Sequence, residues 1–215
     1  MQLGDIPLYL VKDIEQRARQ FLREHLGDQV EIPIDVDLLL ETIDGVDLDY
    51  FPSLRGSYRT EGMVARDTTS GLLVIYVDEE LADRHRQRYR MTVAEELSHV
   101  ILHRSVIEKI SSIEAFKELQ GHRSWYNLER NAKRLAAAIL MPADKVIKAA
   151  EELYPRLVKV AGFDNPEAVK KQLAINLAKN FEVSTQAMTY RLNEWPVRVY
   201  DRADEAMKNE LDYLP

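Results

Sequence analysis

The chain has 215 residues, of which 46% are hydrophobic and 30% are charged, a composition typical of a globular protein with a buried core. It contains no cysteine, which excludes disulfides, thiolate metal sites and cysteine nucleophiles. The net charge of −7 favours solubility and argues against nucleic acid as the main partner.

No part of the sequence resembles a signal peptide or a membrane span. The short apolar run at the N-terminus is broken by Asp5 and Pro7. No stretch approaches the roughly 18 apolar residues that a spanning helix needs. We therefore expect a cytoplasmic protein without membrane contact.

Taken in chain order, the apolar pattern predicts helices at both ends of the chain and strands between them. Helices are expected over residues 8–26 and 37–43, the second followed by Gly45 at a C-cap position. Two apolar, branched runs flank the turn-forming stretch DTTSG and predict a hairpin of residues 62–65 and 72–77. The remaining predicted helices span residues 84–103, 128–140, 144–152, 166–180 and 184–194. The charged tail beyond Pro196 is expected to be peripheral, and the whole reads as one α+β domain.

The helix predicted over residues 84–103 carries its ligand-type side chains on one arc. With Glu95 at zero and about 100° per residue, the arc holds His99 at about 40°, Thr92 at about 60°, His103 at about 80° and Glu96 at about 100°. Most of the remaining surface from Met91 onward is apolar, so the helix is expected to be buried. Buried carboxylates and imidazoles must be paired with one another or bound to a metal. Both an internal network, which would also use an arginine, and a metal site fit this pattern.

The stretch Arg88–His103 resembles the active-site helix of the ImmA/IrrE zinc metallo-endopeptidases. That motif runs arginine-phenylalanine-threonine, two small residues, His-Glu-x-x-His and a trailing aliphatic residue and histidine. The resemblance places Glu96 on the general base and His99 on the second metal ligand. Glu95 stands where the family has its first metal-binding histidine, which is the main departure from the pattern.

A second stretch resembles the family's next helix, in which Glu-x-x-Ala precedes small residues and Leu-Met-Pro. Here Glu129-Arg-Asn-Ala132 is followed by alanines and by Leu140-Met-Pro142. The resemblance makes Glu129 the third metal ligand. The residues alone also allow an exposed pair between Glu129 and Lys133.

The resemblance covers most of the chain. Residues 173–192 are similar to the family's closing helical segment, so the likeness runs from about residue 36 to residue 192. It implies a zincin-like core with a small antiparallel sheet over residues 1–145. Residues 146–215 would form a helical segment packed on that core, within one structural domain.

Glutamate at position 95 changes the chemistry that the resemblance implies. Two neutral imidazoles keep zinc strongly electrophilic, which lowers the pKa of its bound water. A site made of Glu95, His99 and Glu129 carries one more negative charge, so catalysis is expected to be weaker. Zinc accepts carboxylates and harder ions prefer them, so zinc or another divalent ion is the expected cofactor.

Two further alternatives concern the site. His99 and His103 are also four residues apart, so they could bind metal with Glu129, although Val100 would then stand at the position of the base. In zincins a substrate peptide pairs with an exposed sheet edge beside the metal. Residues 72–77 are a candidate for that edge, or else an ordinary core strand.

The resemblance implies a zinc-dependent endopeptidase that cuts a protein, namely a helix-turn-helix transcriptional repressor of a mobile element or stress response. The alternative is a degenerate relative that binds metal or a repressor peptide without cutting it. Residues 183–191 also resemble a DNA-binding helix-turn-helix. Its reading helix carries only Arg191 as a basic residue, so direct binding of nucleic acid is not expected.

Overall fold

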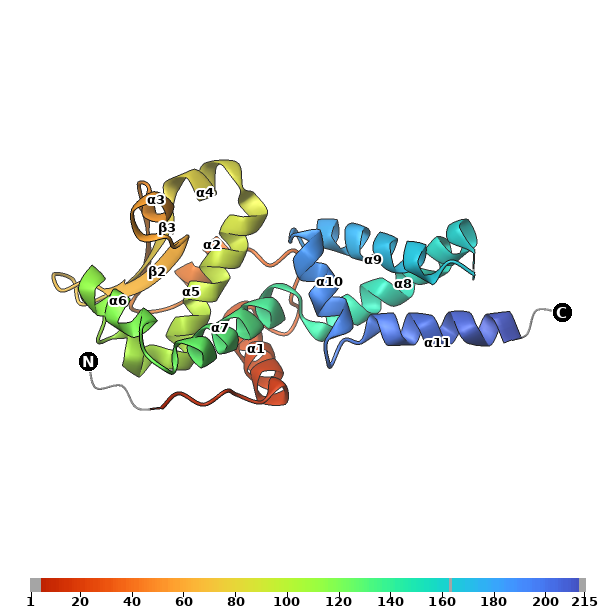
Figure 1. Ribbon diagram of the computed structural model, residues 1–215, viewed down its shortest axis with the longest axis horizontal. Coiled ribbons are helices and arrows are strands. Elements are labelled where there is room, and N and C mark those ends of the chain that lie inside the picture. The colour runs from red at the N-terminus through yellow and green to blue at the C-terminus, as the bar shows by residue number, and fades with distance from the viewer. Residues whose placement is uncertain (1–4, 163, 213–215) are drawn as a thin grey trace. The chain divides into compact units, whose positions relative to one another are not determined.

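The computed structural model describes residues 5–162 and 164–212, and the chain clusters into two compact units (Figure 1). The first unit is Met1–Ile139 and contains the only sheet of the described residues, while Leu140–Pro215 is helical in its described part. The α+β fold is therefore confirmed. The docking of residues 146–215 on the core stays a prediction.

The first unit begins with a long helix, continues with short helices and three strands, and ends with two long helices and a short helix between them. Its elements are α1 (Val11–Leu26), α2 (Val36–Glu41), β1 (Val46–Phe51), α3 (Leu54–Tyr58), β2 (Gly62–Arg66), β3 (Leu73–Asp78), α4 (Glu79–Arg84), α5 (Arg86–Ile107), α6 (Ile113–Gln120) and α7 (Trp125–Leu140). Local caps set several boundaries: the Asp35 carboxylate accepts hydrogen bonds from the N–H groups of Asp37 and Leu38 at the start of α2.

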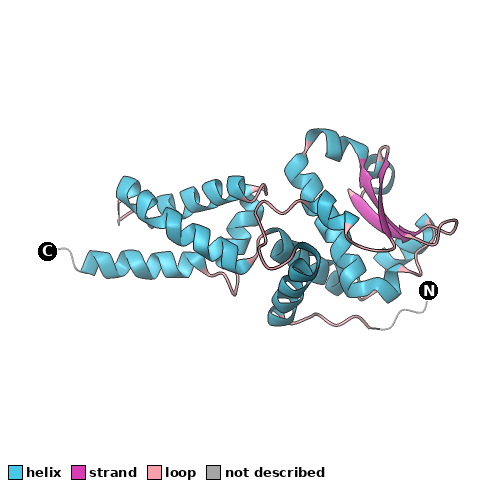
Figure 2. Cartoon of the chain, turned by 180° about the vertical axis from the view of Figure 1, so that it is seen from behind, coloured by secondary structure: helices cyan, strands magenta, loops and turns pink. Residues whose placement is uncertain are grey.

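The three strands form a mixed sheet in the order β1-β3-β2 (Figure 2). The predicted hairpin is confirmed, because β2 pairs antiparallel with β3. The sheet is not wholly antiparallel as expected, because β1 pairs parallel with β3. The chain must cross from the end of β1 back to the start of β3, and the segment with α3 and β2 makes that crossing.

The prediction that residues 72–77 form an exposed edge of the sheet is wrong, and the alternative of an ordinary core strand is confirmed. Strand β3 is the central strand, and nearly all of its side chains are buried, as a strand covered on both faces requires. Strand β2 is an edge and pairs with no further strand among the described residues. On α5, Val93, Ala94 and Leu97 are apolar and fully buried, whereas Thr92 and Glu96 lie against Gly62 of β2.

The second unit is built from four helices, which Figure 1 draws in green-blue to dark blue. They are α8 (Ala143–Ala161), α9 (Pro166–Asn180), α10 (Thr185–Asn193) and α11 (Val199–Asp212). The tail was expected to be peripheral, and this is wrong: α11 buries Val199, Ala203 and Met207. These residues recur four apart, so they form one apolar stripe that the many charges around them obscure.

None of the helices in the described part of the chain combines the length and the apolar character that crossing a membrane requires.

Candidate active site

The polar arc of α5 is buried, as the sequence predicts. Thr92, His99 and His103 are less than 10% exposed, and Glu95 and Glu96 are partly buried. The arc thus places two carboxyl groups and two imidazoles in a region from which most water is excluded. Such groups cost free energy unless they find partners, which makes the contacts of each one informative.

His99 contacts Glu129 from the next long helix. The Nε2 atom of His99 lies 3.2 Å from Oε1 of Glu129, and Lys133 Nζ lies 3.3 Å from the other oxygen of the same carboxylate. Burial by itself raises the pKa of Glu129, but the hydrogen bond and charge of His99, together with Lys133, outweigh it and lower the pKa. Glu129 is therefore a carboxylate shared between an imidazole and an ammonium group. The pair between Glu129 and Lys133 that the residues alone allowed is present, although the Glu129 side chain is only 26% exposed, and the role of Glu129 as a metal ligand stays a prediction.

The two neighbouring glutamates of α5, Glu95 and Glu96, have raised pKa values, in contrast to Glu129. Burial raises the pKa of Glu95 to about 7, with Glu129 and Glu61 adding to the rise and Lys133 opposing it. Burial also raises the pKa of Glu96 well above its usual range, and Glu129 and Glu95 act in the same direction. Three carboxyl groups thus crowd around one ammonium group. A carboxyl group with a raised pKa in such a place is suited to taking and giving protons.

Strand β2 closes against Glu96 through a glycine. A Cβ atom on Gly62 would lie 2.6 Å from Thr92 Cγ2 and 2.9 Å from Glu96 Cγ, distances that real Cβ atoms do not adopt. The absence of a side chain at Gly62 therefore lets the first residue of the edge strand touch the predicted base. Sequence reasoning placed Gly62 only at the start of a strand, and no local pattern reveals this approach.

His103 lies where α5 departs from helical geometry, with φ −131° and ψ 24°. It is 3% exposed, and neither ring nitrogen has a hydrogen-bond partner. Burial, with a further contribution from His99, lowers its pKa to about 3, so the ring is neutral. The centroids of the His99 and His103 rings are 5.7 Å apart, and the Tyr9 ring stacks on His103 from the other side at 6.1 Å.

The N-terminal segment that brings Tyr9 to this place was not expected to matter. Asn131, which is fully buried, accepts a hydrogen bond from the Tyr9 N–H at 2.9 Å and donates one to the Pro7 carbonyl at 2.9 Å. Asn127 donates to the Ile6 carbonyl at 2.9 Å. Side chains of α7 therefore hold an extended segment much as a neighbouring strand would. Asn131, within the Glu129-Arg-Asn-Ala132 stretch, was the available signal.

The described residues provide two adjacent side chains of the types that bind metal ions, but not three. No three His, Asp or Glu side chains within residues 5–162 and 164–212 converge on one point. The 3.2 Å between His99 Nε2 and Glu129 Oε1 does fit two ligands of one tetrahedral ion, which lie about 3.3 Å apart when each bond is about 2.0 Å. Glu129 keeps its negative charge at neutral pH, because its pKa is lowered, and the neutral ring of His103 brings no positive charge to the site. The types of donor atom thus suit a divalent cation, but no third donor joins His99 and Glu129 among the described residues.

The possible DNA-binding helix that the sequence suggested corresponds to α10. Arg191, the one basic residue of α10, is buried, and its Nε donates to the Met141 carbonyl at 2.9 Å. The predicted reading helix therefore presents no arginine or lysine to a phosphate.

Part of the chain matches a known family. The family model described as IrrE N-terminal-like domain (Peptidase_M78) matches residues 58–193, a range that includes β2, β3, α5 and α7. A search of curated proteins finds no relative that matches this chain.

Proposed function

The chain belongs to the IrrE N-terminal-like family of metallopeptidases, and on that premise we propose that it is a metal-dependent endopeptidase that cuts a protein substrate. The observation that carries the proposal is the meeting of His99 and Glu129 beside the buried carboxyl group of Glu96. Ligand-type side chains from two helices and a candidate base thus lie close together. Metal-assisted hydrolysis uses ligands and a base of these types.

Each residue has a separate role in this proposal. His99, Glu129 and Glu95 hold the metal, and zinc is the first candidate because two of its usual ligand types are present. The metal, when bound, would polarise the peptide carbonyl and lower the pKa of water. Glu96 acts as general base and then passes the proton to the leaving amine, for which its raised pKa suits it.

Strand β2 supplies the edge along which a peptide would bind. The Arg66 N–H donates outward to the Ile110 carbonyl at 2.7 Å. Residues alternate along a strand, so Gly62 and Val64 turn their backbone groups to the same outer side, away from β3. A peptide that pairs there passes directly by Gly62 and hence by Glu96.

For the substrate we propose a helix-turn-helix repressor that is encoded beside this protein, as the family resemblance implies. DNA-binding proteins carry clustered positive charge, and this chain has a net charge of −7. Opposite net charges raise the rate of encounter between the two proteins.

The test is cleavage of that repressor by purified protein supplied with zinc, manganese or no metal. We expect the repressor to be cut at one position, and only when metal is present. Mass spectrometry of the fragments identifies that position. Glu96→Gln should lower the rate about 10²- to 10⁴-fold, the range typical of a lost general base. Tight binding without cleavage under every metal condition would overturn the peptidase and favour the degenerate binder.

A second substitution addresses Glu95 directly. Glu95→His restores the ligand type that the family uses and removes one negative charge from the site. Cleavage should then become faster, because the metal is more electrophilic beside a neutral ligand. If Glu95→His binds zinc more tightly but cleaves nothing, the scaffold lacks more than the first histidine.

One observation favours the shifted ligand set of His99, His103 and Glu129. Both ring nitrogens of His103 are buried without a partner, although buried polar atoms are nearly always hydrogen-bonded. A metal contact would supply that partner. This set lacks a base at Val100, so Glu96 would have to serve it from one turn earlier on the helix.

A further inference from the structure

Two arginines and one glutamate form a second charged cluster at the beginning of β2. Arg88 donates from Nε to Glu61 Oε2 at 2.7 Å and pairs through its NH2 group with the other oxygen. Arg55 Nε lies 3.6 Å from the same oxygen Oε1. The carboxylate of Glu61 is 22% exposed, whereas the Arg55 and Arg88 side chains are 61% and 51% exposed. The acid is thus enclosed, and the two guanidinium groups remain open to solvent.

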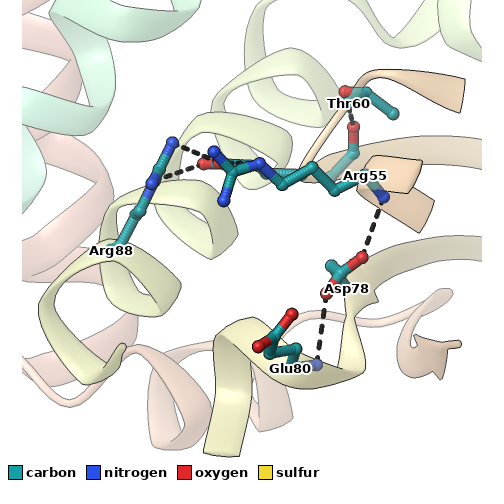
Figure 3. A network of polar contacts seen from close by, with 7 residues as sticks. Arg55, Thr60, Asp78, Glu80 and Arg88 are labelled. Carbon is teal, nitrogen blue, oxygen red and sulfur yellow. Dashed lines mark hydrogen bonds and ion pairs between the residues drawn. The ribbon is translucent and has the colours of Figure 1, made fainter. Parts of the chain in front are cut away.

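The backbone around this cluster is fixed by its neighbours (Figure 3). The buried carboxylate of Asp78 accepts hydrogen bonds from the N–H groups of Arg55 at 2.8 Å and Glu80 at 3.1 Å. The Asp78 N–H donates to the Glu61 carbonyl at 3.0 Å, and the Thr60 hydroxyl donates to the Gly62 carbonyl at 2.7 Å. The arginines therefore start from ordered backbone, which lowers the entropy lost when they bind a further group.

The cluster lies next to the candidate active site. Glu61 directly precedes Gly62, whose missing Cβ lets the strand touch Glu96. A strand advances about 3.3 Å per residue, so a peptide paired with the β2 edge reaches the arginines within two or three residues of Glu96.

The cluster of Arg55, Arg88 and Glu61 carries a net charge of +1. Two guanidinium groups and one carboxylate leave a net positive charge, and Glu61 engages only part of the N–H groups of the arginines. A second carboxylate would complete an alternating array of two arginines and two acids, and such charge-assisted bonds are the strong ones. We propose that Arg55 and Arg88 form a subsite that binds an acidic side chain of the substrate close to the cleaved bond. This inference rests on the proposed function for its substrate.

The test uses the Glu96→Gln protein, which should bind peptides without cutting them, and a phage-displayed library of random twelve-residue peptides with blocked C-termini. We expect Asp or Glu to be enriched about tenfold at one position, at low salt where exposed charges are least screened. The same selection on Glu96→Gln with Arg55→Gln and Arg88→Gln should lose that enrichment. Synthetic amidated peptides with Glu or Gln at that position should differ about tenfold in Kd, and only when both arginines are present.

Matched variants separate this role from a structural one. Arg84→Gln removes an exposed arginine that pairs with Glu80 within one helix, and should leave the enrichment unchanged. The double variant Arg55→Lys with Arg88→Lys keeps both positive charges but lacks the planar N–H groups of guanidinium. It should therefore keep part of the enrichment of acidic residues. Calorimetry on each variant shows whether it is folded.

Three outcomes would overturn the subsite: no peptide binding, no acidic preference, or a preference that survives loss of both arginines. A free C-terminal carboxylate is the other source of this chemistry. Preferred binding of peptides with a free C-terminus and no internal acid would assign the arginines to a chain end and contradict the inference. Cleavage of the preferred peptide by the unmodified protein is measured separately, so binding without cleavage would reject the peptidase and keep the subsite.

Discussion

Helix α5 carries two charged clusters that differ in how well their groups are paired. In its first turn, Arg88 makes close contacts with Glu61 in a partly exposed setting. Two to four turns later, Glu95, Glu96, His99 and His103 are crowded with Glu129, and His103 has no partner for either ring nitrogen. Structural networks satisfy their members, whereas strained or unsatisfied polar clusters gather at functional sites. This contrast supports our proposal that the chemistry takes place at the middle of the helix, with the cluster at its start serving to bind substrate.

The largest expected effect is the loss of stabilisation by metal when a ligand of the cluster of Glu95, Glu96, His99, His103 and Glu129 is removed. At a zinc or manganese concentration 100 times its Kd, bound metal should raise the free energy of unfolding by about 2.7 kcal/mol. His99→Ala should abolish this gain, because His99 belongs to both ligand sets. Thermal unfolding with and without metal measures it.

His103→Ala distinguishes the two ligand sets in the same experiment. If Glu95 is the third ligand, the gain should persist nearly unchanged in His103→Ala. Loss of the gain in His103→Ala, with retention in Glu95→Ala, would instead establish the shifted set.

A smaller effect, on the free energy of unfolding, is expected where strand β2 approaches Glu96 at Gly62. Gly62→Ala forces Thr92 or Glu96 to move and should cost about 1–3 kcal/mol, as overpacking does. Gly56→Ala is the matched control, because its Cβ would meet its nearest atom, Ser53 Cβ, at 3.9 Å. Equal stabilities of the two variants in urea unfolding would show that the close approach at Gly62 is absent in solution.

The smallest effect belongs to an ordinary surface pair. Arg84→Gln removes a contact of 3.2 Å with Glu80 in which both side chains are well exposed. Its free energy of unfolding should change by less than about 0.5 kcal/mol, and metal should stabilise it as much as the unmodified protein. A larger change would mean that exposure is a poor guide to which charged groups of this chain matter.

The sequence predicted the elements whose signal is local. The hairpin around DTTSG and the polar arc of α5 were found because turn residues and helical periodicity are read over a few positions. Strand β1 was missed, since its alternation of Val46, Leu48 and Tyr50 with aspartates lies in a short stretch beside a helix. Helix α11 was missed as a packed element for a similar reason: charges outnumber its apolar stripe.

Contacts between distant segments were beyond the sequence. That His99 and Glu129 meet was expected only through the family resemblance, since 30 residues separate them. The stacking of Tyr9 on His103 and the approach of Gly62 to Glu96 depend on how helices and strands pack, which no local pattern records. The central place of β3 follows from a parallel partner that itself went unrecognised.

The most direct test of the metal centre is the metal content of the protein after dialysis against zinc or manganese and removal of free ions. Mass spectrometry of the elements should find one ion per chain in the unmodified protein. It should find essentially none in Glu129→Ala, which loses the carboxylate that His99 contacts. No bound ion in the unmodified protein, or equal content in Glu129→Ala, would contradict the account.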